Sequence, residues 1–85
     1  MQNKLYIGNL PFQTREEELR EAFARFGNIT DLRLPRDRET GRLRGFAFIT
    51  YASESDAQAA LDMNGKDFGG RPLKVNFANS DRAQA

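Results

Sequence analysis

The sequence predicts a two-layer α+β fold in which four strands and two helices follow the order β-α-β-β-α-β. Two observations predict it. Four short segments alternate apolar and other residues with a period of two, and two segments repeat apolar residues at helical spacing. The 85 residues suffice for one domain with one core. Because both helices connect strands of one sheet, right-handed crossovers place both helices on the same face.

The first strand and the first helix are predicted within residues 4–27. KLYIGNL, residues 4–10, alternates as a strand does, and Pro11 ends it. The stretch TREE that follows fits a capping box, in which the Thr14 hydroxyl and the Glu17 carboxylate each satisfy a free N–H. Gly27 is expected to end the helix. The apolar residues of the inner helix face are Leu19, Ala22, Phe23 and Phe26.

A second strand is predicted over Ile29–Pro35, with Leu32 and Leu34 pointing inward. Pro35 has no N–H to donate, so this strand is expected at an edge of the sheet. Residues 36–42, RDRETGR, read as a loop in which Gly41 is available for a positive φ.

The remaining elements are a third strand, a second helix and a last strand. RGFAFITY, residues 44–51, is the third strand, and Ser53 is expected to cap a helix that ends near Asn64-Gly65. After a turn at Gly69-Gly70, RPLKVNFA, residues 71–78, gives the last strand.

The predicted sheet has one face for the helices and one that no predicted element covers. Along each strand, alternate residues point to the same face of the sheet. The residues at the positions that face the helices are aliphatic: Leu5, Ile7, Leu32, Leu34, Ala47, Ile49, Leu73 and Val75. Tyr6, Phe46 and Phe48 fall on the opposite parity. They are accompanied by Lys4, Arg33, Arg44, Lys74 and Asn76. Rings bordered by cations suit a flat, anionic ligand, and single-stranded nucleic acid is the clearest example.

The other aromatic residues are expected in the core or at its edge: Phe12, Phe23, Phe26, Tyr51, Phe68 and Phe77. The net charge is only +1, but acidic residues concentrate in the helical segments while arginines concentrate over residues 33–44.

Composition excludes several function classes. The chain has no cysteine and no histidine, which removes disulfides, thiolate metal sites and the commonest general base, so neither a metal site nor a cofactor site is predicted. No catalytic constellation can be assembled, and we predict that the protein is not an enzyme. No apolar run is long enough to span a membrane, and the N-terminus lacks a signal-peptide pattern. A cytoplasmic protein is therefore expected, and a monomer is the default expectation.

Two motifs give a resemblance that covers residues 4 to about 78. RGFAFITY resembles the octamer of the RNA recognition motif, with Ile49 in place of the usual valine, and LYIGNL resembles that family's companion hexamer. The chain is similar to small single-domain RNA-binding proteins of bacteria and to the same domain of plant glycine-rich RNA-binding proteins. The resemblance implies a ferredoxin-like sandwich with a four-stranded antiparallel sheet over residues 1–79, followed by a short polar tail, residues 80–85.

The resemblance also implies roles for individual residues. Tyr6 and Phe48 should each stack beneath a base, Phe46 should pack between sugars or beside a base, and Arg44 should pair with a phosphate. Gly45 and Ala47 would be structural. Asn9 is expected either to bond to a base or to cap its loop. Further contacts at the rim are expected from Lys4, Arg33, Arg42, Lys74, Asn76 and Asn79.

The predicted function is a single-stranded RNA-binding module, with a regulatory or chaperone-like role on RNA implied by resemblance. Single-stranded DNA is an alternative ligand, because discrimination depends on a few 2′-hydroxyl contacts. The alternative function is a protein-interaction module on the same fold. The three rings at positions 6, 46 and 48 count against it, since a surface that binds only peptides has no need of all three.

Overall fold

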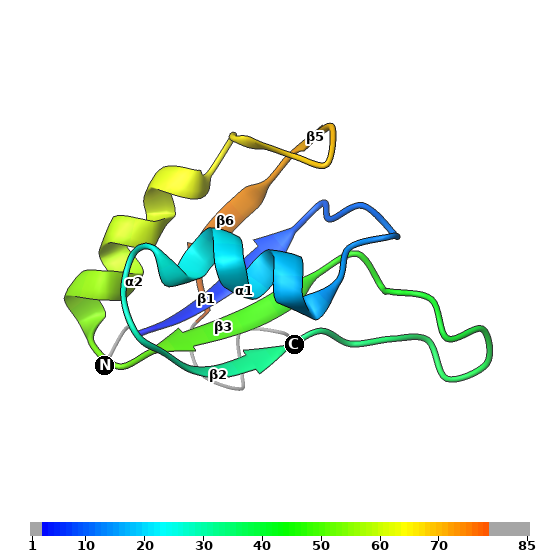
Figure 1. Ribbon diagram of the computed structural model, residues 1–85, viewed down its shortest axis with the longest axis horizontal. Helices are drawn as coiled ribbons and strands as arrows, with labels where there is room; N and C mark the ends of the chain where they lie inside the picture. The colour runs from blue at the N-terminus through cyan, green and yellow to red at the C-terminus, as the bar shows by residue number, and fades with distance from the viewer. Residues whose placement is uncertain (1–2, 79–85) are drawn as a thin grey trace.

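Four antiparallel strands form one sheet in the order β2-β3-β1-β6, and the two helices lie on the same side of it (Figure 1). The computed structural model describes residues 3–78. The predicted α+β class and β-α-β-β-α-β order are confirmed, and so is the edge position of β2. The elements are β1 (Lys4–Gly8), α1 (Glu16–Ala24), β2 (Ile29–Arg33), β3 (Ala47–Tyr51), α2 (Glu54–Ala60), a 3₁₀ turn η1 (Leu61–Met63), β4 (Asp67–Phe68), β5 (Arg71–Pro72) and β6 (Lys74–Phe77).

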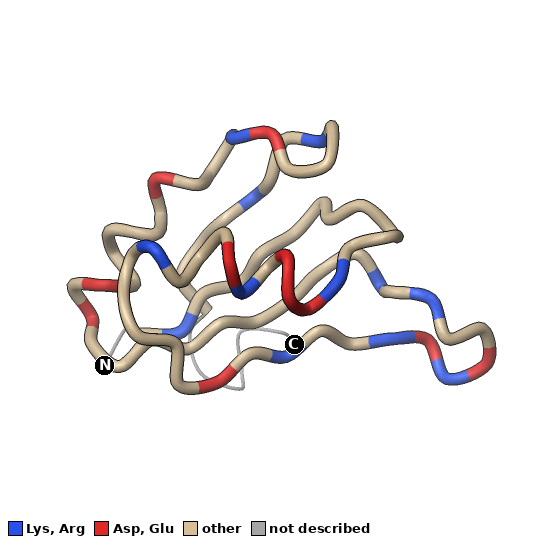
Figure 2. The backbone as a smooth tube through the Cα atoms, viewed as in Figure 1, with Lys and Arg blue, Asp and Glu red and all other residues tan. Residues whose placement is uncertain are grey.

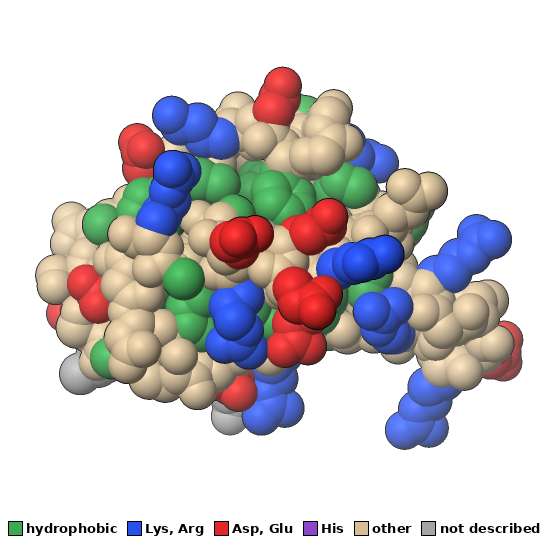
Figure 3. Space-filling view, viewed as in Figure 1, with side chains coloured by type: hydrophobic (Ala, Val, Ile, Leu, Met, Phe, Trp, Pro, Cys, Tyr) green, Lys and Arg blue, Asp and Glu red, His purple; other side chains and the backbone are tan. Residues whose placement is uncertain are grey.

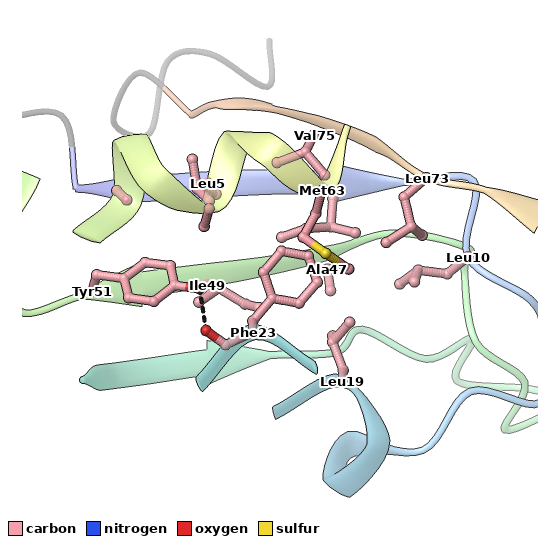
Figure 4. Packing of buried hydrophobic residues seen from close by; sticks show 13 residues of the cluster. Leu5, Leu10, Leu19, Phe23, Ala47, Ile49, Tyr51, Met63, Leu73 and Val75 are labelled. Carbon is pink, nitrogen blue, oxygen red and sulfur yellow. Dashed lines mark hydrogen bonds between the residues drawn. The ribbon is translucent and has the colours of Figure 1, made fainter. Parts of the chain in front are cut away.

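The core lies between the sheet and the helices, as the alternation predicts (Figure 4). The aliphatic residues of the three strands β1, β3 and β6 are buried: Leu5, Ile7, Ala47, Ile49 and Val75. Leu32 and Leu34 are only partly buried, because they belong to the edge strand and to the loop that follows it.

One hydrogen bond ties the sheet to α1 inside this core. The buried Tyr51 hydroxyl at the end of β3 donates to the Phe23 carbonyl oxygen at 2.6 Å, which Figure 4 shows as a dashed line. Burial raises the pKa of the Tyr51 hydroxyl above its ordinary value, and the negative charge of Asp56 raises it further. The folded protein therefore favours the protonated, neutral form of the Tyr51 hydroxyl, which is the form that donates to Phe23.

The aromatic residues predicted for the core divide into three groups. Phe23 and Tyr51 are fully buried, and Phe26, Phe68 and Phe77 are partly buried against the core. Phe12 is 62% exposed, so its assignment to the core was wrong. It lies in the loop between β1 and α1, where the strand alternation has ended and parity no longer gives a residue's side.

Three strands are shorter than predicted. β1 ends at Gly8 and not at Leu10, because Asn9 adopts a positive φ of 63° and turns the chain. β3 begins at Ala47 and not at Arg44, because Gly45 has a φ of 88°, which is incompatible with a strand. β2 ends at Arg33, before Pro35, and its register with β3 shifts between Ile29 and Asp31.

The start of α1 also differs from the prediction. The N-cap position is Arg15, and the Thr14 hydroxyl donates to the Pro11 carbonyl oxygen at 2.8 Å instead of accepting from the helix. Glu18 takes the carboxylate role assigned to Glu17, and its Oε1 accepts from the Arg15 N–H at 3.1 Å. Ser53 caps α2 as predicted, since its hydroxyl oxygen accepts from the Asp56 N–H at 3.2 Å.

The predicted last strand is divided. Asp67–Phe68 and Arg71–Pro72 form a separate two-stranded hairpin, β4-β5, around the Gly69-Gly70 turn, and only β6 joins the main sheet. Pro72 has no N–H for the main ladder, and the Leu73 N–H donates to the Lys66 carbonyl oxygen at 2.9 Å. The predicted boundary at residue 79 and the tail at residues 80–85 lie outside the described residues.

Candidate nucleic-acid interface

Three aromatic rings meet on the side of the sheet opposite the core. Tyr6 of β1 pairs in register with Phe48 of β3, and Phe46 immediately precedes β3. The ring centroids are 6.0 Å apart for Tyr6 and Phe46, and 5.8 Å apart for each of the two pairs that include Phe48. We call Tyr6, Phe46 and Phe48 the aromatic platform. All three side chains are partly exposed, and none of the helices within residues 3–78 lies on their side.

The platform belongs to a row that crosses the whole sheet. Arg33 of β2 pairs with Phe48, Phe48 with Tyr6, and Tyr6 with Asn76 of β6. Residues paired in an antiparallel sheet present their side chains on the same face. A cation, two rings and an amide therefore lie side by side across four strands, which agrees with the parity in the sequence.

The three rings are not parallel. The Tyr6 and Phe46 planes differ by 29°, whereas the Phe48 plane is tilted by 60° from Tyr6 and by 74° from Phe46. The Lys4 ammonium lies over the Phe48 ring, with Nζ 5.1 Å from the centroid. A flat ligand stacked on Phe48 would displace this ammonium. The torsional energy of a phenylalanine side chain has broad minima about χ2. The Phe48 ring can therefore rotate so that its face lies against such a ligand.

The charges near the platform are mostly positive. Lys4 and Lys74 are on the platform side of β1 and β6, and Arg33 is on that side of β2. Arg33 is partly neutralised, because its Nε lies 3.1 Å from the Asp31 carboxylate. The helix side differs: Figure 3 shows acidic side chains gathered over α1, where exposed glutamates occupy positions 16, 17, 18 and 21. The platform side thus carries three cations and the Asp31 carboxylate, whereas α1 carries four glutamates and Arg20.

Two of the predicted cations lie outside the strands: Arg42 lies in the loop where it was predicted, and Arg44 lies in the same loop and not in the third strand. This loop connects β2 and β3, and both side chains are exposed. Since Gly45 interrupts the alternation, parity does not assign Arg44 to the platform face. A Cβ at Gly45 would face open space, so it is the positive φ at this position that requires glycine. Asn79 lies outside the described residues.

Asn9 holds the end of β1 against the β4-β5 hairpin. Its Nδ2 donates to the Pro72 carbonyl oxygen at 2.7 Å, and its Oδ1 accepts from Arg71 Nη2 at 2.8 Å. Asn9 was expected either to bond to a base or to cap its loop, and these two hydrogen bonds are of the second kind. The positive φ of 63° at this position also suits asparagine better than most residues.

One residue that shapes the platform was not predicted from the sequence. Gly8 lies two residues after Tyr6 on the same side of β1, and the Tyr6 ring lies over it. A Cβ at Gly8 would meet the Tyr6 hydroxyl oxygen at 2.8 Å. The period of two places both residues on one face, so a glycine next to the tyrosine was the available signal.

Other kinds of site are not found in the part of the chain that the structure describes. Within residues 3–78, no group of three or more acidic, histidine or cysteine side chains is arranged to hold a metal ion. Over the same residues, no helix has the length and apolar character needed to cross a membrane.

The fold and the platform define the chain as an α+β sandwich domain with an aromatic surface on the uncovered side of its sheet. The family model of the RNA recognition motif matches residues 5–74, and the chain belongs to this family.

Curated relatives and solved structures agree with this assignment. The chain is 48% identical over 86 residues to "Glycine-rich RNA-binding protein 2, mitochondrial" of Arabidopsis thaliana, covering all of this chain and 54% of the relative. It is 44% identical to "Putative RNA-binding protein RbpF" of Nostoc sp., with 87% of this chain and 71% of the relative covered. Several other relatives are longer, and the chain spans as little as 25% of their length. These proteins are named for RNA binding and not as enzymes.

Among solved structures, the crystal structure of RNA-binding protein PG1 is 41% identical with a TM-score of 0.84, covering 88% of this chain and 92% of that one. The structure of the Rna15 domain with bound RNA (GU) is 30% identical with a TM-score of 0.85, covering 95% of this chain and 88% of that one.

Proposed function

We propose that this chain is a single-stranded RNA-binding module and that bases stack on Tyr6 and Phe48. The observation that carries the proposal is the aromatic platform, three partly exposed rings within 6.0 Å of one another and bordered by cations. Exposed rings in a group are costly in water unless a ligand covers them. The family and the relatives' names support RNA as that ligand.

In this mechanism two to four nucleotides lie across the sheet. Each base stacked on a ring contributes about 1–3 kcal/mol, and the ordering of RNA and side chains subtracts from the sum. Phe46, whose centroid lies 5.8 Å from that of Phe48, packs against the sugars or the side of a base. We therefore expect a Kd on the order of micromolar or weaker for a short oligonucleotide.

Cations at the rim take the phosphates. Lys4, Arg33 and Lys74 border the rings from three different strands, and Lys4 exchanges its contact with Phe48 for a phosphate when a base arrives. With about two to four phosphates neutralised, log K against log salt should have a slope of about −1.5 to −3. A slope near −8 would contradict this mechanism and indicate a broad electrostatic surface.

The role we propose is binding and not catalysis, with regulation or remodelling of RNA as its consequence. Single-stranded DNA is a second ligand for the same rings, because a base of either kind has a flat face for stacking. A monomer suffices for the proposed site, since all of its residues come from one chain. The cytoplasmic location stays a prediction, and some relatives are named as mitochondrial.

The test is fluorescence anisotropy of labelled single-stranded RNA, single-stranded DNA and an RNA duplex. Wild type is compared with the double variant Phe46→Ala/Phe48→Ala, whose fold is checked by circular dichroism. We expect wild type to bind the single strands and the folded variant to lose roughly 10-fold or more in affinity. Equal binding by both proteins would overturn the proposal. Arg25→Ala, a cation on the helix side, is the control and should bind like wild type.

A further inference from the structure

We propose that two copies of this chain form a weak reciprocal dimer, in which Phe12 and the arginine loop of each copy dock on the acidic face of α1 in the other. The arginine loop is residues 36–44, within the connection between β2 and β3. The proposal goes beyond RNA binding and is tested with no RNA present. It rests on two surfaces of one molecule that complement each other in charge and in apolar character.

The first surface is a groove beside α1. It lies between α1, the loop after β1 and the turn of the β4-β5 hairpin, and its volume is about 580 Å³. Pro11, Ala22 and Phe68 contribute apolar groups to its lining, and Phe68 is only partly buried against the core. A groove of this size has room for an aromatic side chain.

The rim of this groove is acidic. Glu18 and Glu21 line it, and Glu17 lies one helical turn before Glu21 on α1. Figure 3 shows acidic side chains beside hydrophobic ones on this face. Arg25 is the one cation of the lining, and within residues 3–78 no ion pair engages Glu17 or Glu21. The groove therefore suits an apolar group that is carried beside cations.

The second surface has that character. Phe12 is 62% exposed, and within residues 3–78 it is the one large hydrophobic residue in that condition. It lines a surface cleft together with Arg38, Arg42 and Arg44 of the arginine loop. Among the residues that the structure describes, no ion pair engages these three arginines. Aromatic and arginine side chains are the commonest anchors of protein interfaces.

The charges of the two surfaces are opposite. The arginine loop contains four arginines and two acidic residues, which gives it a net charge of +2. The helix α1 contains four glutamates and one arginine, which gives it a net charge of −3. Figure 2 shows the arginines on a loop that extends beyond the two layers and the glutamates on α1. Contact between the loop of one copy and α1 of another is therefore attractive.

The arrangement of the two surfaces indicates a second copy as the occupant. Pro11 and Gln13 line the groove, whereas Phe12 between them lines the other cleft, and the two linings share no residue. The Phe12 ring therefore lies outside the groove of its own chain. Because the two surfaces meet at the loop after β1, a two-fold axis near this loop pairs both at once, as an isologous contact requires.

The dimer is expected to be weak and to leave the aromatic platform open. Each half of the contact consists of one loop and one helix face, which places the interface at the small end of the size range. We therefore expect a Kd on the order of 10⁻⁴ M. The platform lies on the side of the sheet opposite the helices, so both platforms of the dimer stay uncovered.

Sedimentation equilibrium of the protein without RNA, from about 10 μM to about 1 mM, tests the proposal. We expect the mean mass of wild type to rise toward twice the monomer mass and not beyond it, and the rise to shrink at high salt. Phe12→Ala should weaken the association roughly 5-fold or more. The double variant Phe46→Ala/Phe48→Ala is the control, because it removes platform rings and keeps both docking surfaces. It should associate like wild type.

Charge reversal tests whether the two surfaces contact each other. Glu17→Arg/Glu21→Arg makes the groove basic, and Arg38→Glu/Arg42→Glu makes the loop acidic, so each variant alone brings like charges together. Each should stay monomeric while circular dichroism shows a folded protein. An equimolar mixture of the two variants should associate, because the loop of each then meets a groove of opposite charge.

Four outcomes would overturn the dimer. They are a wild type that stays monomeric up to about 1 mM, a mean mass that passes twice the monomer mass, a mixture of reversed variants that does not associate, and loss of association in the platform variant. The second would mean an open head-to-tail chain, and the fourth would place the contact on the rings. None of them involves RNA, so all of them leave the proposed function unaffected.

Discussion

The Tyr6 ring lies over Gly8, two residues further along β1, so that a Cβ at Gly8 would stand 2.8 Å from the tyrosine hydroxyl oxygen and 2.9 Å from Cε2. Gly8 has no positive φ, so its backbone tolerates a side chain. The requirement for glycine comes from the position of the ring. Because Gly8 has no Cβ, the Tyr6 ring can lie over this position of the strand.

Gly8→Ala should displace the Tyr6 ring without unfolding the protein, because the end of a side chain can move more readily than backbone. We expect RNA affinity to fall about 3- to 30-fold, which corresponds to the loss of much of one stacking contact. Thermal denaturation should show little change. In a Tyr6→Ala background the same substitution should have no effect on affinity. An equal loss in both backgrounds would show that Gly8 acts through something other than the tyrosine.

Asp31→Asn should strengthen RNA binding. Its carboxylate lies 3.1 Å from Arg33 Nε beside the platform, so the substitution frees a cation and removes a charge that repels phosphate. We expect a gain of roughly 2- to 5-fold at low salt that shrinks at high salt. Glu17→Gln, which makes the same charge change on α1, is the matched control and should leave affinity almost unchanged. A similar gain in both variants would mean that only net charge matters.

Asn9→Ala should destabilise the fold by about 1–2 kcal/mol, because it removes the bonds to Pro72 and Arg71 and leaves alanine at a positive φ. Asn9→Gly loses the same hydrogen bonds, but glycine adopts a positive φ without strain. Its loss of stability should therefore be smaller. Urea denaturation of the three proteins measures both effects. Wild-type stability in Asn9→Ala would show that these bonds and this φ contribute nothing.

The stability of the fold should fall at alkaline pH through Tyr51. Burial raises the pKa of its hydroxyl in the folded protein, whereas an unfolded tyrosine ionises near pH ~10. Below that pH the hydroxyl is protonated in both states and the stabilisation is fully present. As pH rises further, the unfolded chain ionises first and the free energy of unfolding falls.

Tyr51→Phe tests this account by urea denaturation at neutral pH and above pH ~10. It should cost about 1 kcal/mol at neutral pH, because the Phe23 carbonyl oxygen loses its donor. It should also lose less stability than wild type on going to alkaline pH. Tyr6→Phe, which changes the other tyrosine, should keep the wild-type dependence. An unchanged alkaline loss in Tyr51→Phe would contradict the role assigned to burial.

Period-two alternation sufficed to predict the platform, because Tyr6 and Phe48 lie within regular strands whose pairing fixes their face. It failed where the backbone leaves the strand. Gly45 and Asn9 adopt positive φ values, and the side of a neighbouring residue then depends on the loop. The exposure of Phe12 depends on such a loop. The close approach of Tyr6 to Gly8 depends on a side-chain rotamer, which a sequence pattern does not contain.

The most direct measurement is an NMR titration of the protein with a short single-stranded RNA, following the ring protons of Tyr6, Phe46 and Phe48 and the backbone amides of both helices. If bases stack on the platform, the ring protons of Tyr6 and Phe48 should show large ring-current shifts, while the amides of α1 and α2 stay nearly unchanged. Shifts concentrated on the helices, with the three rings unaffected, would contradict the account and place the binding surface on the other side of the molecule.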